Sequence, residues 1–146
     1  MEINTTSTSP DETYRLGEQI GDDLAAGDVV LLYGGLGAGK TLLVKGMMNA
    51  LGYDVDEVTS PSFTLVNEYR TDRFNVYHID LWRLDPSNDP ASAVGLEEIV
   101  EVGNSVAVIE WADHLGKAAF PGRVIRIYIE GDGDDPRQIS AVIESD

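Results

Sequence analysis

The chain has 146 residues, of which 26 are acidic and 10 are Lys or Arg, so its formal net charge at pH 7 is −16. A chain of this length is expected to form one domain that is large enough to bury a core. The negative charge repels nucleic-acid phosphates and argues against direct binding of DNA or RNA. The absence of cysteine excludes disulfides and thiolate metal sites.

The sequence shows no sign of a membrane segment. No apolar run approaches the roughly 18 residues of a membrane span, and the Ser/Thr-rich start lacks the basic and apolar segments of a signal peptide. We therefore expect a cytoplasmic protein without membrane contact, with a flexible N-terminus over residues 1–9 and a single domain over residues 10–146. The acidic, lysine-poor composition suits a protein from a salt-loving source, where ions screen the repulsion between like charges. An ordinary acidic bacterial protein explains it equally well.

A helix is predicted over residues 10–26. Ser9 is a typical N-cap, proline follows it, and Glu12 can complete a capping box. Gly27 should end the helix. Thr13 lies in the first turn, where a lone threonine is usually solvated. The spacing of the aliphatic residues predicts a buried face that holds Leu16, Ile20 and Leu24.

The central motif covers residues 34–41 and fits the pattern G-x-x-x-x-G-K-[ST]. An apolar strand is predicted before it, over residues 28–33, and a helix after it, over residues 40–51, which is the order that a phosphate site requires. Lys40 would neutralise nucleotide phosphates and the Thr41 hydroxyl would bind Mg²⁺. Without these two residues the stretch could be a plain glycine-rich turn. The phosphate-binding backbone would come from Gly34, Gly35, Leu36, Gly37, Ala38 and Gly39.

A β-hairpin is predicted next along the chain. Residues 64–69 and 74–81 alternate between apolar and polar side chains, and a three-residue turn joins them. A polar turn over residues 58–63 precedes the hairpin. Asp80 falls at the end of the second strand and is therefore a candidate for binding water or Mg²⁺, although an acid at a strand end is often structural.

A second acid follows another predicted strand. Residues 84–92 are expected to form a loop around a short turn of helix, and residues 95–100 a short helix. Residues 105–109 form an apolar run that ends in Glu110. In P-loop proteins an acid at such a strand end holds Mg²⁺. A charged residue after a core strand is otherwise unremarkable. The interpretation of Glu110 as a Mg²⁺ ligand therefore depends on the presence of the glycine-rich motif.

The C-terminal part is predicted to be a second hairpin. Residues 123–130 and 138–144 alternate, with an Asp/Gly-rich turn over residues 131–136. This turn lacks the twelve-residue spacing of a calcium loop, so no Ca²⁺ site is expected. Together the elements predict an α/β protein with the P-loop NTPase fold: a single domain whose mixed central sheet is flanked by helices and includes two β-hairpins.

Four blocks of sequence resemble the TsaE (YjeE) family, the small P-loop ATPases of bacterial tRNA threonylcarbamoyladenosine synthesis. Residues 32–41 resemble the family motif L-x-G-D-L-G-A-G-K-T, and residues 60–66 resemble S-P-T-[FY]-T-L-V. Residues 76–84 resemble V-Y-H-x-D-L-Y-R-L, and residues 110–111 are the family's E-W. The resemblance extends from about residue 10 to about residue 140.

The resemblance implies a set of roles. Lys40 and Thr41 would bind ATP and Mg²⁺, Glu110 would be the second Mg²⁺ group, and Asp80 would position the attacking water. Lys40, Asp80 and Glu110 are thus the implied catalytic residues. It also places Ser60 in a switch-like loop that faces the nucleotide, and sets Trp111 beside the nucleotide and Thr13 near its adenine end.

The resemblance also implies partners. ATP hydrolysis would reset a complex of TsaB and TsaD type proteins between rounds of transfer to adenosine 37 of tRNA, with tRNA met only through that complex and no contact with DNA or a membrane. Two other functions stay open: a nucleotide-gated binding module in which hydrolysis is incidental, and a small-molecule kinase.

The sequence departs from the family pattern at four positions. Gly35 replaces an Asp, which removes a charge beside the phosphates, and Ser62 replaces Thr but keeps a hydroxyl. Trp82 and Ala112 replace Tyr and Pro, and these two changes are interpreted as packing changes. None of the four removes a predicted phosphate or Mg²⁺ group.

Overall fold

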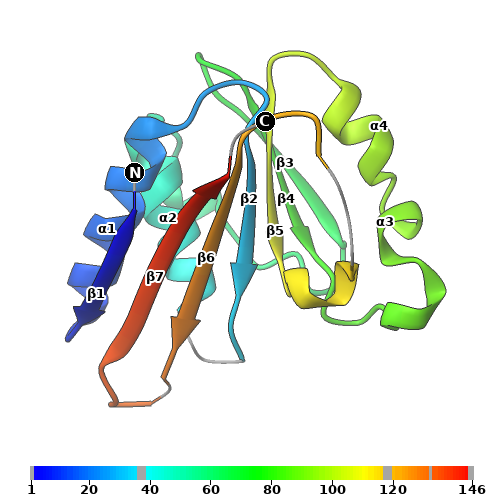
Figure 1. Cartoon of the computed structure of the whole chain (residues 1–146). Helices are drawn as coiled ribbons and strands as arrows, with labels where there is room; N and C mark the ends of the chain where they lie inside the picture. Colours follow the sequence, from blue (N-terminus) through cyan, green and yellow to red (C-terminus); the bar gives the residue numbers. More distant parts are fainter. Residues whose placement is uncertain (1, 36–38, 117–119, 132, 145–146) are drawn as a thin grey trace.

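The computed structural model describes residues 2–35, 39–116, 120–131 and 133–144. Its framework is a seven-stranded sheet with the strand order β1-β7-β6-β2-β5-β4-β3 (Figure 1). The central strands β6, β2, β5 and β4 run parallel. Antiparallel pairing adds β7 and β1 at one edge and β3 at the other. The predicted mixed sheet with two hairpins is therefore confirmed.

The elements have the following bounds. The strands are β1 Ile3–Ser7, β2 Val29–Tyr33, β3 Val66–Arg70, β4 Asn75–Asp80, β5 Ser105–Glu110, β6 Val124–Glu130 and β7 Arg137–Glu144. The α-helices are α1 Pro10–Asp23, α2 Lys40–Ala50, α3 Pro90–Ala93 and α4 Leu96–Glu101, and the 3₁₀ helices are η1 Val55–Glu57, η2 Pro86–Asn88 and η3 Ala112–Leu115. None of the helices in the described residues is both long enough and apolar enough to cross a membrane.

The N-terminal segment, for which the sequence predicted flexibility, contains a strand. Residues 3–7 form β1 and pair with β7, with Ile3 opposite Ala141 and Ser7 opposite Arg137. The strand has one aliphatic residue, so its side chains give little sign of it. Its pairing comes from backbone hydrogen bonds at a sheet edge, which require no apolar pattern.

Helix α1 begins as predicted but ends earlier. The Ser9 hydroxyl accepts a hydrogen bond from the Glu12 N–H at 3.2 Å, whereas the Glu12 carboxylate binds the N–H and hydroxyl of Thr8. The helix stops at Asp23 rather than near residue 26, because the chain turns into a loop fixed by Asp28. The Asp28 carboxylate accepts from the Ala25 N–H at 2.9 Å and also pairs with an arginine.

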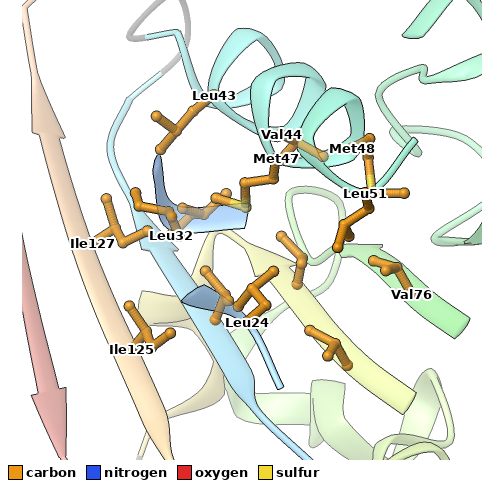
Figure 2. Packing of buried hydrophobic residues seen from close by; sticks show 14 of the residues in the cluster. Leu24, Leu32, Leu43, Val44, Met47, Met48, Leu51, Val76, Ile125 and Ile127 are labelled. Atoms are coloured by element: carbon orange, nitrogen blue, oxygen red, sulfur yellow. The ribbon is translucent and has the colours of Figure 1, made fainter. Parts of the chain in front are cut away.

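The sheet is packed on both faces. One set of alternate side chains, such as Val30 and Leu32 of β2, meets α1 and α2. The other set, such as Val29 and Leu31, meets the segment from η2 to η3. Figure 1 shows α1 and α2 together, apart from α3 and α4, and Figure 2 shows the methionine and aliphatic side chains of α2 lying over the central strands. This two-sided burial explains why β2 and β5 are continuous apolar runs.

Glycines let α1 and α2 pack with their backbones in close approach. A Cβ atom added at Gly17 would lie closer than 3.0 Å to the carbonyl oxygen of Leu43, and one added at Gly46 equally close to that of Tyr14. Backbone atoms cannot rotate away as the end of a side chain can. This close approach fixes the position of α2 and hence of the loop that precedes it.

The change Gly46→Ala should therefore destabilise the fold. In an open helix this change stabilises by up to about 1 kcal/mol, but overpacking here should reverse the sign and cost about 1–3 kcal/mol. Urea denaturation followed by circular dichroism measures the difference in the free energy of unfolding. Gly103→Ala is the control, since its added Cβ meets nothing within 4 Å among the described residues. Equal stability of Gly46→Ala and the unmodified protein would contradict the close approach.

The net charge of −16 predicts a dependence of stability on salt. Repulsion among surface carboxylates destabilises the compact state, and dissolved ions screen it. We expect the melting temperature to rise by roughly 3 °C or more between low and molar KCl, which corresponds to a gain on the order of 1 kcal/mol. NaCl at the same ionic strength should act alike. A melting temperature that does not rise with salt would exclude a salt-adapted protein.

Candidate functional site

The predicted site residues meet at the carboxyl edge of the parallel strands. Strand β2 ends at Tyr33 and leads into the glycine-rich loop, while β4 ends at Asp80 and β5 at Glu110. The register places Asp80 directly opposite Glu110, and Glu110 opposite Leu32 of β2. This edge is where ligands bind in open α/β sheets, because the loops there diverge around a crevice.

A cleft of about 320 Å³ lies at this edge. It is lined by Gly35, Gly39, Lys40, Thr41, Leu42, Ser60, Ser62, Asp80, Trp82, Glu110 and Trp111. The cleft therefore brings together every described residue that was predicted for the site except Thr13 and Gly34. The predicted Leu36, Gly37 and Ala38 lie outside the described residues.

The start of α2 offers backbone donors to the cleft. Gly39 is the N-cap of α2 and has a φ of 105°, a left-handed conformation that favours glycine. The first N–H groups of a helix have no partner within the helix and carry partial positive charge. Lys40 and Thr41 follow at the first two helical positions, so their side chains and these N–H groups border the same space. Such an arrangement suits a phosphate group.

Lys40 is held by neutral groups in this structure. Its Nζ donates to the carbonyl oxygens of Gly34 and Gly35, the second at 3.2 Å, and lies 4.1 Å from the centre of the Trp111 ring. Only 6% of the residue is exposed. Burial lowers the pKa of Lys40, while the nearby carboxylates, Glu110 foremost, act in the opposite direction. A bound polyanion would give this cation a stronger partner than carbonyl oxygens do.

Asp80 is a buried carboxylate with two contacts. Its Oδ1 accepts from the Trp82 N–H at 2.8 Å, and its Oδ2 accepts from the Ser60 hydroxyl at 3.4 Å. The Ser60 and Ser62 hydroxyls are 2.9 Å apart. Burial raises the pKa of Asp80, and the hydrogen bond from Trp82 partly opposes this rise. The polar turn before the hairpin is thus in contact with the acid at the end of β4.

Glu110 contacts a histidine to which the sequence-based predictions assigned no role. Its Oε2 lies 2.5 Å from Nε2 of His78, and Nδ1 of His78 lies 2.9 Å from the Tyr69 hydroxyl. His78 is fully buried. Strand alternation puts His78 on the same face of β4 as Asp80. Its partner Glu110 lies on a strand that is distant in the sequence, and the parallel β4–β5 pairing brings the two residues together.

Thr13 lies in a neighbouring cavity rather than in the cleft. The interpretation of Thr13 as a solvated helix residue is wrong: it is 2% exposed, and its hydroxyl is 2.7 Å from that of Ser7 in β1. A cavity of about 230 Å³ is lined by Thr13 together with Gly39 and Leu42 and with residues of the β6–β7 turn. Gly39 and Leu42 also line the cleft, so the two spaces adjoin.

Two aromatic residues form one wall of the cleft. The rings of Trp82 and Trp111 have centroids 4.8 Å apart, and Trp82 is 40% exposed. The interpretation of Trp82 as a packing change missed this position at the site. Trp111 is the N-cap residue of η3 and has a φ of 56°, which is uncommon for a non-glycine residue. Arg83 is not among the described residues that line the cleft, and its guanidinium lies 4.2 Å from the centre of the Phe63 ring.

Gly35 is not required by crowding. A Cβ added there would meet nothing within 4 Å among the described residues, and its φ is not positive. A Cβ atom at this position would therefore be accommodated by the described residues. The structure gives no steric reason for the glycine.

The residues present fit a magnesium ion. In the described part of the chain, no three His, Cys, Asp or Glu residues form a cluster that could hold a metal. Mg²⁺ does not require such a cluster, because it commonly takes one or two protein oxygens and completes its shell with water and substrate phosphates. The Thr41 hydroxyl and the Glu110 carboxylate border the same cleft and supply oxygens of this kind.

The fold and the site define a class of protein. A glycine-rich loop between a central parallel strand and a helix, with Lys and Thr at the helix start, is the phosphate-binding unit of P-loop proteins. The chain therefore has the P-loop NTPase fold. Superposition agrees, since YdiB of Bacillus subtilis matches with a TM-score of 0.75 at 30% identity, over 100% of this chain and 87% of that one.

Sequence comparison gives the family. The family model for "Threonylcarbamoyl adenosine biosynthesis protein TsaE" matches residues 7–139. The TsaE of Bacillus subtilis is 34% identical over 95% of this chain and 84% of its own, and that of Treponema pallidum 38% over 94% and 98%. The Nostoc relative is 41% identical, with the match spanning 72% of this chain and 65% of that protein. The chain belongs to the TsaE family, whose members are named for tRNA threonylcarbamoyladenosine biosynthesis.

Proposed function

We propose that this protein is a Mg²⁺-dependent ATPase that supports tRNA threonylcarbamoyladenosine biosynthesis by binding and resetting a TsaB–TsaD type complex. The proposal rests on one observation above all: Lys40, Thr41, Asp80 and Glu110 border a single cleft at the start of α2. The reaction consumes ATP and water and releases ADP and inorganic phosphate. We also propose a cytoplasmic location, because the pathway acts on tRNA.

The chain's own groups divide the work of this reaction. Lys40 exchanges its carbonyl partners for the β- and γ-phosphates, whose charge the N–H groups at the start of α2 also stabilise. Thr41 and Glu110 would hold Mg²⁺, which would supply positive charge to offset that of the phosphates. Asp80 and Ser60, already in contact, place the attacking water. Phosphoryl transfer needs little else from a protein than such positioning and charge.

The adjoining cavity is a place for the nucleoside. It shares Gly39 and Leu42 with the cleft. A nucleotide whose phosphates bind at the glycine-rich loop could therefore extend its nucleoside into this cavity. In this arrangement the buried Thr13 forms part of the wall of the nucleoside pocket. Thr13 would then lie at the adenine end of the nucleotide. Its buried side chain would contribute to the shape of the pocket.

The lining of the cleft predicts that the protein alone hydrolyses ATP slowly. No arginine is among the described residues that line it. Arginine supplied by a partner is a common way to complete such a site. The acidic surface also fits indirect contact with tRNA, since basic partners could carry the nucleic acid while this chain does not touch it.

Phosphate release is the direct test. Inorganic phosphate is measured with the protein alone, with TsaB and TsaD type proteins of the same organism, and with tRNA added. We expect slow release alone and faster release with the complex. No phosphate under any of these conditions would overturn the proposal, and so would a phosphorylated metabolite as the product, which indicates a kinase.

A nucleotide-gated binding module is the second candidate. It is favoured by the segment of residues 59–63, where Ser60 contacts Asp80 while Phe63 is 81% exposed. Nucleotide could order this segment for docking without any need for hydrolysis. A complex that keeps working through many rounds with a nonhydrolysable ATP analogue would support this module over the ATPase.

A further inference from the structure

Four groups form a continuous hydrogen-bonded series from the loop to the predicted Mg²⁺ residue. The Tyr69 hydroxyl donates to the carbonyl oxygen of Thr59 at 3.1 Å and lies 2.9 Å from Nδ1 of His78. Nε2 of His78 lies 2.5 Å from Oε2 of Glu110. The three side chains come from the adjacent strands β3, β4 and β5, so the series crosses the sheet.

Burial makes this series structurally demanding. Tyr69, His78 and Glu110 are each at most 3% exposed. A buried polar group without a partner is costly, so each member depends on the next. Because both ring nitrogens of His78 have a partner, the orientation of the ring is fixed, and with it the position of Oε2 of Glu110. A buried histidine with satisfied hydrogen bonds can be purely structural. Whether this one has a function therefore depends on the groups that the series connects.

One end of the series lines the cleft, and the other end adjoins a residue that does. Glu110 lines the cleft directly, and Thr59 precedes Ser60, which contacts Asp80. A movement of the 59–63 segment that shifts the Thr59 carbonyl therefore also removes a partner of Tyr69. The effect passes through His78 to the carboxylate that would hold Mg²⁺.

We propose that Tyr69 and His78 are positioning residues that link the 59–63 segment to Glu110, so that ordering of this segment and binding of Mg²⁺ favour each other. The inference rests on the proposed function of the cleft. Such a coupling is reciprocal: whatever amount the ordered segment adds to Mg²⁺ affinity, Mg²⁺ adds to the order of the segment. Partners of metal-binding side chains commonly change metal affinity by 10- to 100-fold.

Tyr69→Phe tests the link with little disturbance, because it removes only the hydroxyl. With ADP at a fixed concentration, Mg²⁺ is titrated while tryptophan fluorescence is followed; the chain has two tryptophans, Trp82 and Trp111, and both line the cleft. We expect Tyr69→Phe to need about tenfold more Mg²⁺ for the half-maximal change, with ADP affinity in the absence of Mg²⁺ unaltered. Tyr53→Phe is the control, since that ring packs against Tyr69.

Amide hydrogen exchange of Thr59, Ser60, Ser62 and Phe63 gives a second readout that does not involve turnover; Pro61 has no amide hydrogen. Exchange should be faster in Tyr69→Phe, and addition of Mg²⁺ and ADP should slow it in the unmodified protein but not in the variant. Unchanged Mg²⁺ dependence together with unchanged exchange would overturn the proposal. Failure of the unmodified protein to release phosphate would overturn the proposed ATPase instead and leave this comparison valid.

Substitution of His78 separates positioning from packing. His78→Gln keeps an N–H group that can donate to Glu110, whereas His78→Leu does not. We expect the Mg²⁺ requirement to rise in the order unmodified protein, His78→Gln, His78→Leu. Equal requirements in the two variants would show that only the volume of the side chain matters, and would overturn the role of its hydrogen bond.

Discussion

Replacing Lys40 with alanine should lower the rate of ATP hydrolysis by roughly a hundredfold to a thousandfold, which is the usual cost of losing one donor aimed at developing charge. Lys40 is the only lysine among the residues that line the described part of the cleft. Its present partners are carbonyl oxygens and an aromatic ring, so binding a polyphosphate would require Lys40 to give up contacts with neutral groups only. Phosphate release and the affinity for ATP, both measured at saturating Mg²⁺, should fall together.

A second substitution at Lys40 separates the loss of its charge from the loss of its packing. Lys40 is buried, so alanine leaves a gap, and Lys40→Met should restore packing without restoring charge. Lys45→Ala is the matched control, because Lys45 lies on the same helix but does not line the cleft. If Lys40→Met hydrolysed ATP as fast as the unmodified protein, the cleft would not be the phosphate site.

Local patterns in the sequence were enough to predict the centre of the fold. The strand, loop and helix around Lys40 are consecutive in the chain, and each hairpin is formed by neighbouring segments. Asp80 and Glu110 could be assigned to the site because each lies at the end of a predicted strand and each falls in a block that resembles the family motifs. Nothing in these predictions required knowledge of a contact between segments that are far apart in the sequence.

The features that escaped prediction depend on distant contacts. Strand β1 pairs with β7, which lies at the opposite end of the chain. Strand β1 also contains Ser7, whose hydroxyl lies 2.7 Å from the hydroxyl of the buried Thr13. The contact of His78 with Glu110 requires the β4–β5 register, and that with Tyr69 requires the β3–β4 register. Periodicity shows which face of a strand is buried, but not which side chain of the next strand it meets there.

Replacing Asp80 with asparagine should separate hydrolysis from binding. Asparagine keeps an oxygen that can accept from the Trp82 N–H, as Oδ1 does now at 2.8 Å, and therefore keeps the local structure. It removes the negative charge that would orient and activate water. We expect ATP affinity within about threefold of the unmodified protein and hydrolysis lower by roughly 10²–10⁴-fold. Asp113→Asn is the control, since it removes an exposed carboxylate that acts on the charge of Lys40.

The same variant decides between the two candidate functions. With TsaB and TsaD type partners and tRNA, an ATPase that resets the complex predicts that Asp80→Asn supports one round of modification and then stops. A nucleotide-gated module predicts many rounds, because binding alone is enough. The distinction holds because the asparagine amide can still form a hydrogen bond with the Ser60 hydroxyl, so the contact with residues 59–63 is kept while the negative charge is lost. Continued rounds with Asp80→Asn, at a rate equal to that of the Asp113→Asn control, would show that hydrolysis at this cleft is incidental to its work on tRNA.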